Sequence, residues 1–209
     1  MTYPRIIAIT GLLGSGKTTA AKVLQEEFGY TRIRLAGPLK EMLKAIGLTD
    51  ADVDGALKEV PHPLLGFKTP RQAMQTLGTE WGRNHIGEDF WTNVWKHKVK
   101  QHDLVVVDDV RFPNEADAVR SLGGEIWKVE RPGSQMQAHA SETELQHINA
   151  DMVLPNCWSI EELKALVREA MEPYIVPKAV WRTLEPNSVI DAHAAARPTP
   201  AELDPADGA

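Results

Sequence analysis

The chain has 209 residues, 43% of them hydrophobic, and a formal net charge of −6. This length and composition predict one domain with a sizeable core, and the acidic balance disfavours a nucleic-acid-binding surface. The single cysteine, Cys157, excludes an internal disulfide. Because no apolar run is long enough to span a membrane, we expect a cytoplasmic protein whose partners are small molecules rather than nucleic acids or membranes.

A glycine-rich turn follows the first apolar run, residues 6–9. Gly11, Gly16, Lys17 and Thr18 match the spacing G-x-x-x-x-G-K-[ST] of a phosphate-binding loop. Its glycines let backbone N–H groups close around an anion, and the following helix points its positive end at the same place. The motif predicts that Lys17 reaches the outer phosphates of a nucleotide and that the Thr18 hydroxyl holds Mg²⁺. The remaining expected nucleotide contacts in the loop are Gly14, Ser15 and Thr19.

Two helices and a short strand are predicted after the loop. Periodicity indicates a helix that ends at Gly29, an alternating strand over 31–36, and a helix that begins at Gly37-Pro38. The second helix is expected to bury Leu39, Met42, Leu43 and Ile46. Lys40 lies on its other side, close to a strand end beside the loop, and is kept as a site candidate. Residues 48–68 show no periodicity and indicate an exposed insert.

Residues 69–83 read as a capped helix. Thr69-Pro70-Arg71-Gln72 supplies an N-cap, a proline in the first position and a capping glutamine. The predicted buried stripe is Met74, Leu77 and Trp81. Gly78 and Gly82 share another face with Arg71 and Gln75, and two alternatives explain them: a ligand lying along that face, or close helix–helix packing. A cation in the first turn of a helix opposes the helix dipole, so a bound phosphate would stabilise Arg71 there.

The next helix, from Glu88 or Asp89 to about residue 101, is strongly apolar. Its Trp91 belongs either to the core or to a stacking surface for a base. The apolar strand that follows, residues 103–107, ends in Asp108 and Asp109. An acid at the end of such a strand, beside the phosphate loop, is placed to organise Mg²⁺, and either aspartate could fill that position.

Further strands are predicted over 125–129 and 152–154, and a last capped helix from Ser159 to Pro173. Five strands alternating with helices predict an α/β fold of the P-loop NTPase type, with a doubly wound, five-stranded parallel sheet. The expected domain covers 1–174, with a helical acceptor-binding insert over 48–101. Residues 132–150, which contain no lysine or arginine, would form a lid or a helical connection. The Pro- and Ala-rich acidic segment 175–209 reads as a disordered tail.

With these motifs in place, the chain resembles the phage-type deoxynucleoside monophosphate kinases, within the wider nucleoside monophosphate kinase group. The matching stretches are the phosphate loop, Ala36-Gly-Pro-Leu-Lys40, residues 69–82, Asp109-Val-Arg-Phe-Pro-Asn-Glu115 and His139-Ala-Ser-Glu142. They cover the chain to about residue 172, and the middle stretches are more specific than the loop. The resemblance places the protein in the cytoplasm of a host cell if a phage encodes it, and a homodimer is compatible with it.

The resemblance implies transfer of a phosphoryl group from ATP, with Mg²⁺, to a deoxynucleoside monophosphate, giving the diphosphate. It implies that Arg71 binds the acceptor's phosphate, that Asp109 organises Mg²⁺ together with Thr18, and that Arg111 bridges donor and acceptor. Arg131 would close over the transferring group. Lys17 and these arginines form the expected catalytic set with Asp109. The expected acceptor contacts are Leu13, Gly37, Lys40, Arg71, Gln75, Trp91, Arg111, His139 and Ser141.

Two other functions were weighed against this one. A kinase of another small phosphorylated acceptor, of the phosphomevalonate or dephospho-coenzyme A type, would use the same loop and arginines. A GTP-dependent switch would need Asp-x-x-Gly and Asn-Lys-x-Asp. The chain instead reads Asp108-Asp-Val-Arg111 and Asn156-Cys-Trp-Ser159, so the sequence disfavours the switch.

Overall fold

The structure is a computed structural model that describes residues 3–133 and 144–175. Its centre is a parallel sheet of five strands in the order β2-β3-β1-β4-β5. Strand β1 lies at the centre, with β3 and β2 on one side and β4 and β5 on the other. The carboxyl end of β1 is therefore the switch point where such sheets bind ligands. The doubly wound sheet predicted from the sequence is therefore confirmed. The strands are β1 Ile6–Thr10, β2 Thr31–Arg32, β3 Val105–Val107, β4 Glu125–Glu130 and β5 Met152–Pro155.

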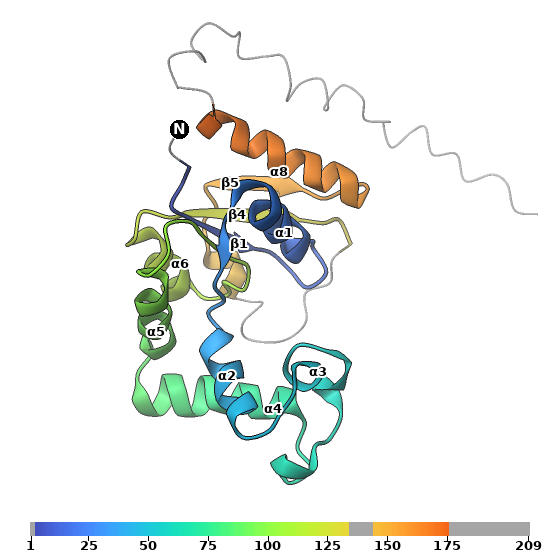
Figure 1. Cartoon of the computed structure of the whole chain (residues 1–209), viewed down its shortest axis with the longest axis vertical. Coiled ribbons are helices and arrows are strands. Elements are labelled where there is room, and N and C mark those ends of the chain that lie inside the picture. Colours follow the sequence, from blue (N-terminus) through green and yellow to red (C-terminus); the bar gives the residue numbers. More distant parts are fainter. Residues whose placement is uncertain (1–2, 134–143, 176–209) are drawn as a thin grey trace, which may run out of the picture.

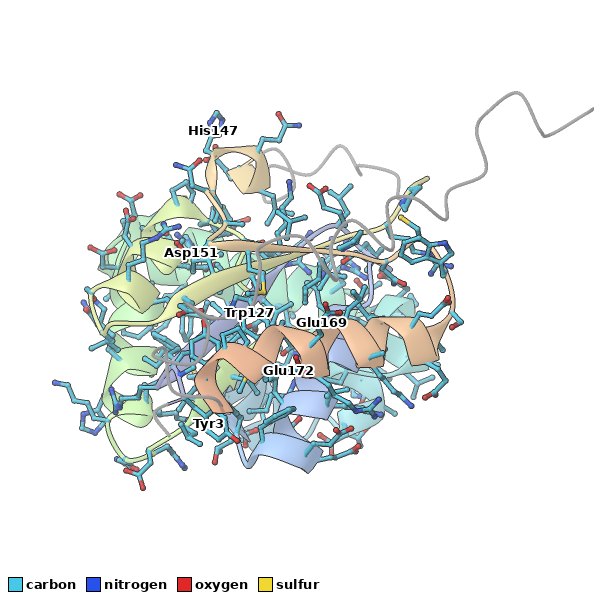
Figure 2. The ribbon with its side chains drawn as sticks, turned by 90° about the horizontal axis from the view of Figure 1, so that it is seen from above. Tyr3, Trp127, His147, Asp151, Glu169 and Glu172 are labelled. Atoms are coloured by element: carbon cyan, nitrogen blue, oxygen red, sulfur yellow. The ribbon has the colours of Figure 1, made fainter. Side chains whose placement is uncertain are left out.

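Helices cover both faces of the sheet (Figure 1). On one face, α1 (Lys17–Phe28) and α8 (Ile160–Ile175) bury Ile7 and Ile9 together with Trp127. Figure 2 looks onto this face, with α8 in front and Trp127 between the helix and the strands. The alternate residues of β1, Ile6 and Ala8, face α5 (Phe90–Val99) and α6 (Pro113–Arg120) on the other side. Burial on both faces explains why the central strands are continuously apolar.

A third hydrophobic cluster holds a helical layer beyond the sheet (Figure 1). Leu39, Leu43 and Val53 pack there with Trp91 of α5. The cluster thus includes α2, which precedes residue 48, and α5 contributes residues both to it and to the core under the sheet. The elements of this layer are α2 Gly37–Ala45, α3 Asp50–Val53, the 3-10 turns η1 Ala56–Glu59 and η2 Pro63–Leu65, α4 Pro70–Gln75 and the π-helix η3 Thr76–Ile86.

The helix beginning at Pro70 continues as a π-helix, which the sequence analysis did not predict. Thr69 and Gln72 form the expected reciprocal cap. From Thr76 the turns widen, and at the far end the Gly87 N–H donates to the Gly82 oxygen five residues back. Residues spaced by 3.6 no longer line one face of such a helix. Trp81 is therefore 37% exposed, and its expected burial is wrong.

Three smaller expectations also differ. Met42 of α2 and Ile46, which follows that helix, are 40% and 57% exposed, because α2 packs on the helical layer through Leu39 and Leu43. The strand predicted over 31–36 ends at Arg32, since the chain turns at its end towards Asp109. Helix α8 continues past Pro173 to Ile175, so proline does not stop it.

Residues 134–143 of the predicted lid and the tail beyond Ile175 lie outside the described residues. The described part of the lid includes the 3-10 turn η4, Glu144–His147. Within 3–133 and 144–175, no helix has the length and apolar character needed to cross a membrane.

Candidate active site

The phosphate-binding loop leads from β1 into α1 with the backbone that its glycines permit. Gly11, Gly14 and Gly16 have φ angles of 139°, 75° and 108°, a region that disfavours side chains. A Cβ on Gly11 would also collide with the carbonyl oxygen of Val129 in β4. The loop is thus pressed against the neighbouring strand, and α1 begins directly behind it at Lys17. This places the positive end of a 12-residue helix at the loop.

Two polar side chains of the loop bear on whether it can bind an anion. Lys17 Nζ donates to the carbonyl oxygens of Gly11 and Leu12, each at 2.7 Å, so its ammonium group lies over the loop. Ser15 Oγ is buried and has no hydrogen-bond partner in the described structure. A buried hydroxyl without a partner is costly, and a phosphate oxygen would accept its hydrogen bond. The loop therefore fits the phosphates that its sequence predicts.

Thr18 and Asp108 meet beside the loop, where β3 ends. Thr18 Oγ1 lies 3.3 Å from Asp108 Oδ2. Arg32 Nε donates to Asp108 Oδ1 at 2.8 Å, and its Nη2 contacts Asp108 Oδ2 and, at 3.4 Å, the Thr18 hydroxyl. Burial raises the pKa of Asp108, but the hydrogen bonds and charge of Arg32, with Arg34 nearby, hold it below its usual value. The carboxylate is ionised and already has a cation against it.

This pair of oxygen donors fits Mg²⁺. The ion usually takes one or two carboxylates and completes its shell with water and substrate phosphates. Thr18 and Asp108 supply such ligands beside the phosphate loop. No group of three or more His, Cys, Asp or Glu gathers among residues 3–133 and 144–175, so phosphate and water oxygens would have to complete the shell there.

Asp109 points away from this position. Its two carboxylate oxygens accept hydrogen bonds from the backbone N–H groups of Leu35 and Ala36, each at 2.9 Å. Burial raises the pKa of Asp109 despite these two donors. The resemblance gives the metal role to Asp109, but Asp109 holds the turn between β2 and α2, and it is Asp108 that lies beside Thr18. The sequence left both aspartates open because adjacent strand-end residues point to opposite sides.

Three cations lie within electrostatic reach of Lys58, which belongs to η1. Burial lowers the pKa of Lys58, and the charges of Lys40, Arg71 and Arg111 lower it further, while the charge of Asp54 opposes them. Arg71 pairs with Glu59. Such a group of like charges favours an anion. Lys58 was missed because it lies in the 48–68 segment, where no periodicity or motif marks it.

Lys40 takes part in a second ion-pair network on this side. Its Nζ lies 2.5 Å from Asp54 Oδ1, and Arg34 Nη1 lies 3.0 Å from the same oxygen. The pKa of Asp54 is raised by partial burial but lowered more by Lys40 and Arg34. The network links α2 with α3, and through Arg34 it reaches Asp108, 3.5 Å away.

Arg131 follows β4 and lies at the loop. Its Nη1 is 3.4 Å from the Gly14 oxygen. It lines a cavity of about 400 Å³ together with Leu12 and Ser15 of the loop, Leu145 of η4 and Cys157 after β5. Arg131 thus lies beside the phosphate loop, and its expected closure over the transferring group stays a prediction.

Trp91 does not offer a face to a base. It is 6% exposed, its ring lies on Gly82, and its Nε1 donates to the Gly78 oxygen at 2.8 Å. A Cβ on Gly78 would also come within 3.1 Å of Leu39. The two glycines thus serve close helix packing, and the expected stacking role of Trp91 is corrected to a structural one.

The remaining expected acceptor contacts are less defined. Leu13 is 58% exposed on the loop, and Gln75 is exposed at the end of α4. Gly37 begins α2 at the end of the turn held by Asp109. His139 and Ser141 lie outside the described residues.

Comparison with known proteins agrees with this geometry. A sequence profile of the deoxynucleotide monophosphate kinase family matches residues 68–167. A protein of Acanthamoeba polyphaga mimivirus, assigned by name to these kinases, is 36% identical over 175 residues, which cover 75% of this chain and 91% of that protein. The deoxynucleotide monophosphate kinase of Enterobacteria phage T4 is 29% identical over 108 residues, 49% of this chain and 45% of that enzyme.

A solved structure confirms the fold class. Shikimate kinase from Aquifex aeolicus superposes with a TM-score of 0.51 at 12% identity, over 82% of this chain and 98% of the enzyme. At this identity the likeness concerns the fold alone, an α/β fold of the P-loop type.

Proposed function

The chain belongs to the deoxynucleotide monophosphate kinase family, and we propose that it transfers the γ-phosphoryl group of ATP, with Mg²⁺, to a deoxynucleoside 5′-monophosphate. The product would be the diphosphate. One observation supports a two-substrate site: Lys40, Arg71 and Arg111 lie within electrostatic reach of Lys58, which gives a second group of cations besides the lysine of the phosphate loop. A hydrolase or a switch that binds one nucleotide has no use for a second anion site.

In this proposal the loop holds the donor and the helical layer holds the acceptor. The loop amides and Lys17 bind the outer phosphates of ATP, and Arg131 covers them from the end of β4. Arg71 leaves Glu59 to grip the acceptor phosphate with its planar fork. Arg111, in the connection between β3 and α6, neutralises charge on the transferring group. Thr18 and Asp108 would hold Mg²⁺, which neutralises phosphate charge and aligns the oxygens when bound.

A coupled assay of ADP formation tests the proposal. With ATP and Mg²⁺, we expect turnover on at least one deoxynucleoside monophosphate and none on phosphomevalonate or dephospho-coenzyme A. The matched control is Lys17→Ala, which should abolish turnover without changing the acceptor site. Turnover confined to a non-nucleotide acceptor, or ATP hydrolysis that ignores every acceptor, would refute it.

A further inference from the structure

One buried carboxylate, that of Glu115 in α6, joins the helical layer to the backbone of Arg111. Its Oε1 accepts a hydrogen bond from Arg83 Nη2 at 2.7 Å, and Arg83 belongs to the last turn of η3. Its Oε2 accepts the backbone N–H of Arg111 at 2.8 Å and that of Phe112 at 3.1 Å. Each oxygen thus serves a different part of the fold.

The bonds to Oε2 alone have a local explanation. Phe112 is the N-cap of α6, and a glutamate three residues later commonly returns to the backbone of the cap. Such a cap needs no charged partner and is usually exposed. Here the Glu115 side chain is 8% exposed, and Arg83, 14% exposed, is its partner.

Arg83 is held in a fixed orientation. Its guanidinium carbon, Cζ, lies 4.0 Å from the centre of the Phe112 ring, and its Nη1 is 3.3 Å from Asn114 Oδ1. Asn114 in turn donates to Asp89 at the start of α5, at 3.1 Å. This ion pair has one direct hydrogen bond and is largely buried, so removing one partner leaves a charge that is costly to bury.

We propose that Arg83 and Glu115 are positioning residues that make the placement of Arg111 depend on the position of the helical layer. The inference rests on the proposed function, in which that layer binds the acceptor and Arg111 acts on the transferring group. When η3 is seated, Arg83 fixes Glu115, and Glu115 fixes the N–H groups of Arg111 and Phe112. When η3 shifts, the ion pair loosens and the segment carrying Arg111 loses its support.

The test begins with Arg83→Met in the free enzyme. Hydrogen–deuterium exchange of residues 109–115 should become faster, while exchange of the phosphate loop stays at the wild-type rate. With substrates, kcat should fall by about 10²-fold, as expected for a misplaced catalytic group, while KM for ATP and for the acceptor changes little. Arg83→Lys, which can still pair with Glu115, should restore most of both properties.

Arg168→Met is the matched control. Arg168 forms an ion pair with Glu27 through two bonds of 2.7 Å, but this pair is more exposed and lies on the α1–α8 face. This variant should change neither the exchange of residues 109–115 nor kcat. Should Arg83→Met not fold, Glu115→Gln takes its place with the same expected changes.

Wild-type exchange of residues 109–115 in these variants would overturn the proposal. So would a higher KM for the acceptor at unchanged kcat, because Arg83 would then be a substrate ligand. The exchange measurement uses no substrate, so it remains valid if the wild-type enzyme acts on no deoxynucleotide, an outcome that would contradict only the proposed function.

Discussion

The guanidinium of Arg32 contacts both carboxylate oxygens of Asp108, through Nε and Nη2. The same guanidinium contacts the Thr18 hydroxyl, so it covers the two groups that would hold Mg²⁺. A cation thus stands where the proposed function places Mg²⁺. Each carboxylate oxygen has two lone pairs, so Arg32 and Mg²⁺ could both contact Asp108, but two cations at one carboxylate repel each other, and Arg32 therefore competes with the metal.

Arg32→Gln should strengthen metal binding in the absence of nucleotide. Removing the competing charge leaves Asp108 ionised and accessible, and we expect the dissociation constant for Mn²⁺ to fall about tenfold, or about 1.4 kcal/mol. Electron paramagnetic resonance of free and bound Mn²⁺ measures this, with Arg168→Gln as the control. An unchanged dissociation constant would show that Arg32 does not compete with the metal.

The two strand-end aspartates should differ sharply. Asp108→Asn should lower kcat by about 10²-fold or more at nearly unchanged stability, as for loss of a preorganised electrostatic group. Asp109→Asn should mainly lower stability, by about 1–3 kcal/mol, because one backbone N–H of the β2–α2 turn loses its acceptor. Turnover and urea unfolding of both variants decide the matter. The reverse pattern would return the metal role to Asp109.

Gly82→Ala should destabilise the helical layer. Its methyl group would overlap the Trp91 indole, and overpacking of this kind costs about 1–3 kcal/mol. Gly78→Ala, where the nearest atom is a flexible Leu39 methyl at 3.1 Å, should cost less. Thermal unfolding of both variants, and of Gly82→Ala combined with Trp91→Leu, measures the effect. If the second change does not restore stability, the indole is not the cause.

The Arg71–Glu59 pair should yield to the acceptor. Both side chains are about half exposed, at 47% and 60%, so their ion pair contributes at most about 1 kcal/mol. Arg71→Ala should raise KM for the acceptor at least about tenfold, whereas Glu59→Gln should lower KM or leave it unchanged. Steady-state kinetics on both variants compares them. An Arg71→Ala defect in ATP binding alone would move Arg71 out of the acceptor site.

Glu115 should make stability depend on pH. Burial raises its pKa to about 7, opposed by the Arg111 amide and the Arg83 charge and assisted by Asp109. The folded protein therefore binds this proton more tightly than the unfolded chain between about pH 4.5 and 7. Its contribution to the free energy of unfolding falls as pH rises through that window, by about 1.4 kcal/mol per pKa unit at most. Urea unfolding across pH should show this slope in the wild type but not in Glu115→Gln, and parallel curves would contradict it.

The features that the sequence predicts best are those set by local chemistry. The phosphate loop, the stop at Gly29 and the cap at Thr69 follow from backbone geometry and hydrogen bonds within a few residues. The central strands are predicted because burial on both faces leaves a continuous apolar run, as at β3.

The features it misses depend on contacts made far along the chain. Asp108 and Asp109 differ only in what faces them, Arg32 in one case and the β2–α2 turn in the other. Lys58 gains its neighbours through the fold of an irregular segment. The π-helix at Thr76–Ile86 replaces the regular helix expected there, and Trp81 then leaves the stripe predicted from a 3.6-residue period.

Helix α5 carries Trp91 into the cluster of the helical layer and Trp95, one turn on, into the core under the sheet. The cluster of the helical layer and the core under the sheet therefore share α5. Loss of packing in either one would expose a tryptophan of this helix, Trp91 or Trp95. Because α5 is shared, we expect that the helical layer, which we propose binds the acceptor, cannot be exchanged as a separate unit for that of another kinase. Such an exchange would have to include α5, which also packs against the sheet through Trp95 and Val99.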